Sequence, residues 1–263
     1  MSIASHSPSQ TIEVTLRQHH GGKVAWVAID NQRRLNTLNS ALLERLIGTL
    51  TGLQGDASLR ALVLTGAGNK SFIGGADIKE MADFDAATAR AFITRIHGVC
   101  QALRDLPVPV IARIDGYCLG AGLEIAAACD MRAASTKSVF GMPEVKVGIP
   151  SVVEACLLPR LIGWGRTSEF LLTGENIDAA TAAAWGFIEK LTPDDKLDAA
   201  VESWLASIVA AGPLAVRAQK KLMRRWEELP LAQAVQAGID AFAQAQESDE
   251  PRRMMMHFVN RKR

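Results

Sequence analysis

Residues 109–130, PVIARIDGYCLGAGLEIAAACD, place a strand signal, a tight turn and a helix signal in immediate succession. The segment 109–115 starts at a proline and is rich in branched apolar residues, which is typical of a buried strand. Glycines interrupt this pattern, and the small apolar residues that follow predict a helix opening at Gly122. A strand that leads through a short turn into a helix is the building unit of α/β proteins.

The same order recurs on both sides of this segment. Candidate strands occupy residues 11–17, 23–30 and 61–66, with short ones near 131–140, and candidate helices lie at 40–54 and around Phe92, Ile96, Val99 and Leu103. The first two strands are separated by a turn that contains two glycines, which predicts a hairpin. Repeated strand and helix units favour a layered α/β domain with parallel pairing.

The last quarter of the chain has a different character. From about Asp194 the pattern is almost continuously helical, and prolines 213, 230 and 251 divide the helices. We therefore expect an α/β core domain over 11–193 and a helical region over 194–263 that caps the core or pairs with other copies. Residues 1–10 are polar and lack an apolar signal core, so we expect a disordered tail there.

Composition argues against several classes of protein. The 263 residues are 48% apolar and 22% charged, without an apolar run long enough to span a bilayer. A net charge of +1 provides no overall field for nucleic acid. The four cysteines are widely spaced, and no histidine lies at ligand spacing from them. We expect reduced, buried thiols in a cytoplasmic protein, with no metal site.

Two nucleotide-binding patterns are matched only in part. The segment 65–71, TGAGNKS, lacks the glycine that must precede the lysine of a P-loop. The segment 120–125 has the outline of a dinucleotide-binding turn, but bulky Ile125 occupies its third small position. The chain has neither a GxSxG nor an HExxH motif, which argues against serine and zinc hydrolases.

Two glycine-rich turns are candidates for holding a ligand. They are SFIGGADIKEM, residues 71–81, and DGYCLGAGLE, residues 115–124, and each follows a predicted strand. Glycine lets backbone N–H groups approach a ligand closely, and a helix N-terminus directs free N–H groups outward. Two such turns on adjacent strands can direct two amides at one carbonyl oxygen. This arrangement is an oxyanion hole, which stabilises negative charge on that oxygen.

Two glutamates stand beside these turns in apolar surroundings. Glu124 lies in the first turn of the predicted helix, and Glu144 follows Pro143 at the end of a predicted strand. Apolar neighbours raise the pKa of a carboxyl group towards the working range of an acid or base. The alternative is structural: Glu124 complements the helix dipole, and Glu144 forms an exposed ion pair with Lys146.

At these residues the sequence resembles the crotonase family, also called the enoyl-CoA hydratase/isomerase superfamily. The resemblance covers nearly the whole chain through the blocks LNTLN (35–39), LTGAG (64–68), SFIGGADIKEM (71–81), the opening segment 109–130, FGMPEVKVGI (140–149), LPRLIG (158–163) and LTGE (172–175). It implies a crotonase-like spiral of ββα repeats followed by a helical trimerisation region, with homotrimers that often pair into hexamers. It also implies an acyl-CoA substrate of fatty acid metabolism, with no cofactor beyond the coenzyme A of the substrate itself.

The resemblance implies a role for individual residues. The thioester oxygen would accept hydrogen bonds from the amides of Ala76 and Ala121. Glu124 would position the water that attacks C3, and Glu144 would exchange a proton with C2. The residues expected to contact the substrate or CoA are Arg34, Leu35, Gly75, Asp77, Ile78, Lys79, Gly120 and Ser151. The implied activity is the reversible addition of water to the C2=C3 bond of a 2-enoyl-CoA.

One block departs from the family pattern. Hydratases usually carry IPGAGGTQR after the second glutamate, where this chain has IPSVVEACL, residues 149–157. In the family this segment lines the acyl pocket, so a changed acyl group or an altered reaction, such as isomerisation or decarboxylation, is an alternative. Dienoyl-CoA isomerases carry a carboxylate where this chain has Val152, and Glu154 comes two residues later.

Basic residues near the end of the chain leave a further alternative open. Lys220, Lys221, Arg224 and Arg225 form a helical stripe, and the chain ends in NRKR. A solvated face is the default interpretation, and contact with CoA phosphates is the functional one. The alternative to an enzyme is a non-catalytic oligomer that binds CoA or RNA. The near-zero net charge and the lack of interleaved aromatic residues count against RNA.

Overall fold

The computed structural model describes residues 10–19 and 21–260, so all but one residue of the tail expected at 1–10, and residues 261–263, lie outside the described residues. The larger sheet has the order β1 (Thr11–His19), β2 (Gly22–Asp30), β3 (Leu59–Gly66), β5 (Val110–Ile114), β7 (Met131–Ser135) and β10 (Lys190–Thr192). The smaller sheet has the order β4 (Ser71–Ile73), β6 (Tyr117–Leu119), β8 (Val139–Gly141) and β9 (Ile177–Asp178). The β1–β2 hairpin is antiparallel, as predicted, and the rest of the larger sheet is parallel.

Successive strand pairs alternate between the two sheets. β3, β5 and β7 join the larger sheet, while β4, β6 and β8, which follow them directly, join the smaller one. Each pair leads into a helical segment, namely α2 (Ile78–Met81) with α3 (Ala86–Asp105), then α4 (Ala121–Ala128), then the 3₁₀ helix η2 (Pro143–Val147). The chain thus winds as a spiral of ββα turns, which confirms the predicted fold class.

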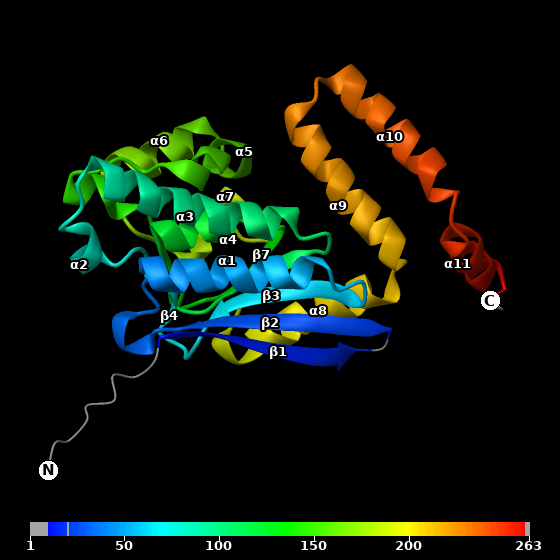
Figure 1. The fold of residues 1–263 in the computed structure, drawn as a ribbon, viewed down its shortest axis with the longest axis horizontal. Helices are drawn as coiled ribbons and strands as arrows, with labels where there is room; N and C mark the ends of the chain where they lie inside the picture. The colour runs from blue at the N-terminus through cyan, green and yellow to red at the C-terminus, as the bar shows by residue number, and fades with distance from the viewer. Residues whose placement is uncertain (1–9, 20, 261–263) are drawn as a thin grey trace, which may run out of the picture.

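The larger sheet is covered by helices on both faces. In β2, Ala25, Val27 and Ile29 pack into the main core with α1 (Ser40–Gln54) and α3, while Val24 and Trp26 pack against α8 (Leu197–Ala210). Alternate residues of a strand point to opposite faces, so a strand buried on both sides is apolar throughout. Figure 1 shows α1 and α3 over one face of the sheet and α8 against the other.

Shorter elements complete the core. They are the helices α5 (Leu158–Ile162), α6 (Trp164–Thr173) and α7 (Ala179–Trp185) and the 3₁₀ segments η1 (Gln32–Arg34), η3 (Val153–Leu157) and η4 (Asp194–Lys196). Within the described residues, no single helix is long and apolar enough to cross a membrane. The segments 194–210 and 213–228 reach that length and composition only together, across a bend of 110°.

The C-terminal region consists of helices, as predicted. α9 (Pro213–Glu228) and α10 (Leu231–Ala245) form a helical hairpin that stands away from the sheets, and α11 (Glu250–Val259) follows it (Figure 1). Pro213 occupies the first turn of α9, where its missing N–H costs no hydrogen bond. α10 leaves a row of large apolar side chains exposed, namely Leu231, Val235, Ile239 and Phe242.

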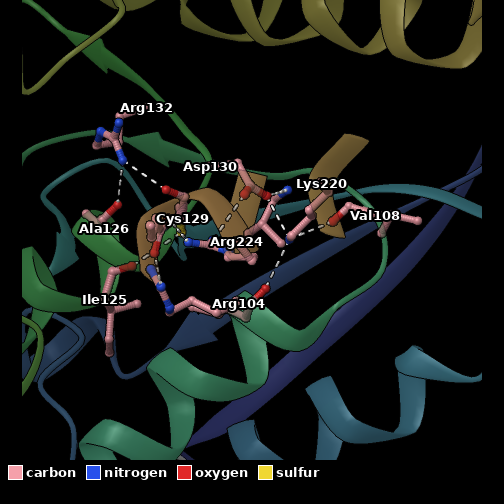
Figure 2. A network of polar contacts seen from close by, with 12 residues as sticks. Arg104, Val108, Ile125, Ala126, Cys129, Asp130, Arg132, Lys220 and Arg224 are labelled. Carbon is pink, nitrogen blue, oxygen red and sulfur yellow. Dashed lines mark hydrogen bonds and ion pairs between the residues drawn. The ribbon is translucent and has the colours of Figure 1, made fainter. Parts of the chain in front are cut away.

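The basic stripe on α9 does not form one solvated face. Lys220 is buried, and its ammonium group contacts Asp130 Oδ2 at 2.7 Å and donates to the carbonyl oxygens of Leu103 and Val108 at 3.2 and 2.9 Å. Arg224 pairs with Asp130 Oδ1 at 3.2 Å (Figure 2). The solvated-face interpretation is therefore wrong for Lys220, because tertiary packing turns this side of α9 towards the core. The two residues fasten α9 to the core through Asp130.

We expect Lys220→Met to lower the free energy of unfolding by about 3 kcal/mol, because it leaves the largely buried carboxylate of Asp130 and two carbonyl groups short of a donor. Arg224 still pairs with Asp130, which places the loss at the low end of the range for broken buried ion pairs. Urea unfolding followed by circular dichroism measures it. Lys221→Met is the matched control, since Lys221 is exposed on the same helix. Equal stability of the two variants would contradict this role of Lys220.

The expected burial of the cysteine thiols is correct for three of four residues. Cys100, Cys118 and Cys129 are buried and free, whereas Cys156 is free but exposed. Cys156 lies in η3, on the wall of a surface hollow that also includes Arg160 and Trp164. The apolar neighbours of Cys156 in the sequence did not reveal this, because exposure here depends on how η3 is oriented against the core.

Candidate active site

The two glycine-rich turns meet at one place in the fold. Gly75 has φ 108° and Gly120 has φ 50°, which are backbone conformations that favour glycine. A Cβ atom on Gly120 would lie 4.0 Å from Gly75 Cα, and one on Gly75 would lie 3.4 Å from the carbonyl oxygen of Leu119. The backbones of the two turns are therefore neighbours in space, and the positive φ values are what require glycine at these positions.

The amides of Ala76 and Ala121 are placed to bind a ligand. Leu38 pairs with Ala76 in a parallel bridge, in which the Leu38 N–H donates to Gly75 O at 2.9 Å and Leu38 O accepts from Asp77 N–H at 2.8 Å. The N–H of Ala76 therefore points away from Leu38. Ala121 is the first residue of α4, where an N–H has no acceptor within the helix. Among the described residues, neither amide has a bridge or helix acceptor, as an oxyanion hole requires.

A cavity of about 110 Å³ lies between these turns. Its lining includes both turns, both predicted glutamates and the apolar side chains Ile78, Met81, Ile93, Ile96, Val147, Ile149, Pro150 and Val152. Larger hollows of about 440 and 750 Å³ lie along α9–α11 and beside η3 and α6, and neither includes the glycine turns. The small cavity is therefore where amides, acids and an apolar wall come together.

Glu124 is almost completely buried within α4, with 3% of its surface exposed. Burial, and then the negative charges of Glu144 and Glu154, raise its pKa to about 8. Its Oε1 atom is buried without a hydrogen-bond partner in the described part of the chain. A group with this pKa is mainly neutral at pH 7, so complementing the helix dipole with negative charge does not explain it.

Glu144 lies at the start of η2 and points towards the Gly120 turn. A Cβ atom on Gly120 would be only 2.5 Å from Glu144 Oε1, and the hydroxyl of Ser151 donates to Glu144 Oε2 at 2.9 Å. Burial raises the pKa of Glu144 as well. Lys146 pairs with Glu175 at 2.7 Å, so the structural alternative of a Glu144–Lys146 ion pair does not form.

The other predicted contact residues divide into two groups. Gly75, Gly120 and Ile78 line the cavity, and Ser151 reaches it through its bond to Glu144. Arg34, Leu35, Asp77 and Lys79 do not line it.

These four residues support the first glycine turn. Arg34 Nη1 pairs with Asp77 Oδ2 at 2.7 Å, Asp77 accepts from the Lys79 N–H at 3.0 Å, and Leu35 O accepts from the Gly74 N–H at 2.8 Å. Leu35 and Asn36 have φ values of 54° and 55°, which let this segment turn back against Gly74. Together these bonds hold the turn in position for Ala76.

One residue near the site was assigned no role from the sequence. Glu154, in η3, has 6% of its surface exposed, and its Oε1 lies 2.8 Å from Nδ1 of His97 on α3. The signal in the sequence was an acid within the otherwise apolar run 149–157. Its contact with His97 spans 57 positions and could not be predicted from local pattern.

No group of histidine, cysteine and acidic side chains within the described residues has the geometry of a metal site. The residues that line the cavity include Ala76 and Ala121, with their backbone amides, and Glu124 and Glu144, with their carboxyl groups. This set can polarise a carbonyl group and transfer protons beside it.

Residues 19–263 match the family described as "Enoyl-CoA hydratase/isomerase". The chain is 34% identical to a short-chain-enoyl-CoA hydratase of Clostridium acetobutylicum over 92% of this chain and 93% of that protein. It is 31% identical to a crotonyl-CoA hydratase of Syntrophomonas wolfei over 92% and 93%. A crystal structure of enoyl-CoA hydratase from Bacillus anthracis superposes with a TM-score of 0.89 at 31% identity, over 95% of this chain and 96% of that one.

Proposed function

Since the chain belongs to the enoyl-CoA hydratase/isomerase family, and is an enoyl-CoA hydratase-like enzyme, we propose that it adds water reversibly to the C2=C3 bond of a 2-enoyl-CoA. The observation that carries the proposal is the pairing of Glu124 and Glu144 around one cavity with the amides of Ala76 and Ala121. Addition of water involves no net oxidation or reduction. The proposed reaction therefore needs no flavin or nicotinamide, and coenzyme A enters as part of the substrate. We propose that it also uses no metal, because the two amides would polarise the carbonyl group and the two carboxyl groups would transfer the protons.

The amides act on the carbonyl oxygen of the thioester. When water attacks C3, negative charge moves through C2 onto this oxygen and forms an enolate. Donors held in place before the reaction stabilise that charge more than they stabilise the neutral thioester, which lowers the barrier. The apolar side chains lining the cavity exclude competing water and strengthen these bonds.

The two glutamates share the proton transfers. Glu124 handles the oxygen at C3, and Glu144 handles the proton at C2. Hydration starts with Glu124 ionised and Glu144 protonated. Water gives its hydroxyl to C3 and a proton to Glu124, while Glu144 protonates C2. The two glutamates together therefore gain one proton and lose one. Elimination of water is the same step reversed, starting with Glu124 protonated and Glu144 ionised.

The protonation of Glu124 in the free protein suits the second of these states, because its pKa is about 8. Burial raises the pKa of Glu144, while the hydrogen bond from Ser151 acts to lower it. We infer that for hydration the shared proton passes from Glu124 to Glu144. The attacking water, which contacts both acids in this mechanism, is the carrier we infer. Because the acids interact, their titration belongs to the pair.

The proposal is tested with crotonyl-CoA and longer or branched 2-enoyl-CoA thioesters. Hydration removes the conjugated enoyl thioester, and the loss of its ultraviolet absorbance measures the rate. We expect turnover with at least one of these substrates. If none is hydrated while a dienoyl-CoA or malonyl-type thioester reacts, the second candidate below replaces hydration.

That second candidate is another reaction of the same family, isomerisation or decarboxylation. It is supported by the segment 149–157, in which Val152 lines the cavity and Ser151 bonds to Glu144. These side chains occupy the part of the site that would contact the acyl group. These side chains restrict which acyl groups fit the site. The substrate series above identifies the acyl group that is accepted.

We also propose that the enzyme is a cytoplasmic homo-oligomer, a trimer or a dimer of trimers. The exposed apolar row of α10 supports this, because Leu231 is 81% and Phe242 is 70% exposed, and contiguous apolar surface of this kind marks an interface. We propose that the enzyme binds neither nucleic acid nor a membrane. The cytoplasmic assignment is supported by the four free cysteines.

We expect Phe242→Asp combined with Leu231→Asp to lower the oligomeric state, because two charges would be buried in the interface. Light scattering coupled to size-exclusion chromatography gives the mass. The wild type should elute at a multiple of three chains and the variant as a smaller species. Leu16→Asp, on the exposed part of β1, is the matched control. A wild-type protein that is monomeric at micromolar concentration would contradict the proposal.

A further inference from the structure

Glu154 is a buried acid that the proposed mechanism does not use. Its Oε1 contacts His97, but Oε2 is buried with no hydrogen-bond partner among the described residues. A buried carboxylate with one unpaired oxygen lowers the free energy of unfolding, so a functional role would explain why Glu154 is present. Glu154 does not line the cavity. It lies behind the cavity wall, where it would act through a neighbouring residue.

The backbone beside Glu154 is strained. Val153 has φ 37°, a region that β-branched residues rarely adopt, and strain of this kind concentrates at functional sites. The strained residue separates Val152, which lines the cavity, from Glu154, which is buried where η3 packs against α3 and α4. The conformation of Val153 thus places Val152 in the cavity wall and Glu154 behind that wall.

The groups around Glu124 come from three elements. η2 contributes Glu144, η3 contributes Glu154, and α3 contributes Cys100 and, beyond Glu154, His97. η3 packs against both α3 and α4, which brings Glu154 to the side of α4 that carries Glu124 among buried residues. Cys100 is buried on α3, and burial, followed by the negative charges of Glu154 and Glu124, raises the pKa of its thiol. The charges that act on Glu124 from these elements are both negative.

We propose that Glu154 is a positioning residue that keeps the shared proton of the site on Glu124, with His97 holding the Glu154 carboxylate in place. The inference deepens the proposed function and rests on it for its catalytic consequence. A negative charge in a poorly solvated region makes the ionisation of a nearby carboxyl group costly. His97, whose side chain is 52% exposed, anchors Glu154 from the solvent side without itself being buried.

The direct test is the titration of Glu124. Protein labelled with ¹³C at the glutamate carboxyl carbon is titrated by NMR, and Glu124→Gln identifies the Glu124 signal by its loss. We expect the wild-type signal to titrate near pH 8. In Glu154→Gln, which keeps the shape and removes the charge, we expect the midpoint to fall by about one pH unit. Glu13→Gln, on the exposed part of β1, should leave it unchanged.

A second readout separates this role from that of a structural ion pair. In our account Glu154→Gln removes a buried like charge, and the partner it leaves, His97, is half-exposed. The melting temperature should therefore stay equal or rise. The rise should be largest above pH 8, where ionised Glu124 adds to the repulsion. A structural pair would give a lower melting temperature and an unmoved Glu124 titration, and either an unmoved titration or a lower melting temperature overturns the proposal.

The catalytic consequence is measured on the hydration of crotonyl-CoA. We expect the alkaline limb of kcat/KM to move to lower pH in Glu154→Gln, with KM at pH 6 unchanged because the residue does not touch the substrate. If the protein hydrates no enoyl-CoA but the NMR midpoint shifts, the proposed function fails and the effect of Glu154 on Glu124 stands. If it hydrates crotonyl-CoA and neither the midpoint nor the limb shifts, the role of Glu154 fails alone.

Discussion

Glu124→Gln and Glu144→Gln should each lower the turnover of crotonyl-CoA by about 10²- to 10⁴-fold. Glutamine keeps the size and polarity of the side chain but cannot take up or release the proton. The cavity and the two amides are left in place, so the binding of the CoA thioester should change little. Steady-state kinetics give turnover, and calorimetric titration with a saturated acyl-CoA gives binding.

The double variant makes this prediction sharper. Because one proton is shared between the two acids, removing both should cost about as much as removing one, and the two losses should not multiply. Glu13→Gln is the control, since it changes an exposed acid of β1 that does not line the cavity. Full turnover in both single variants would return Glu124 and Glu144 to a structural role.

Gly120→Ala should lower turnover by about 10²- to 10³-fold, the usual cost of losing one oxyanion-hole donor. Two constraints act at this position. With φ 50°, Gly120 adopts a conformation that disfavours alanine, and the added Cβ would meet Glu144 Oε1 at 2.5 Å. The substitution therefore shifts the Ala121 amide and displaces an acid of the site at once.

A glycine outside the site provides the matched control. Gly186 also has positive φ, 88°, but an added Cβ there would make only an ordinary contact, 3.6 Å from Leu161 O. Gly186→Ala should lose stability through backbone strain and keep its turnover per folded molecule. Thermal melting and steady-state kinetics on both variants separate the two effects. Equal turnover of the two folded variants would argue against Gly120 as a hinge of the oxyanion hole.

The sequence was informative where local pattern decides structure. The first strand and the helix of 109–130 and the helix at residues 40–54 were predicted closely, because apolar periodicity and glycine placement act over a few residues. The turn expected at 115–124 instead contains a short strand, β6, whose pairing with β4 and β8 depends on distant segments. The meeting of Glu124 with Glu144 was also predicted, since each acid follows a strand of the same repeated unit. Family resemblance supplied the substrate class, which neither periodicity nor spacing can give.

What the sequence did not reveal depends on contacts between distant segments. Lys220 reads as one of four basic residues in a stripe, and only the docking of α9 onto Asp130 shows that it is buried. The pairing of Glu154 with His97 and the positive φ of Val153 follow from how η3 packs on α3, which no local pattern encodes. The pKa of Glu124 likewise depends on acids that come from η2 and η3.

A crystal structure of the protein with a bound 2-enoyl-CoA, or an analogue that does not react, tests the central claim most directly. We expect the thioester oxygen to lie about 2.7–3.1 Å from the amide nitrogens of both Ala76 and Ala121. Glu124 should face C3 and Glu144 should face C2 on the same side of the double bond. A thioester oxygen bound away from these amides, or either glutamate turned towards solvent, would contradict the account.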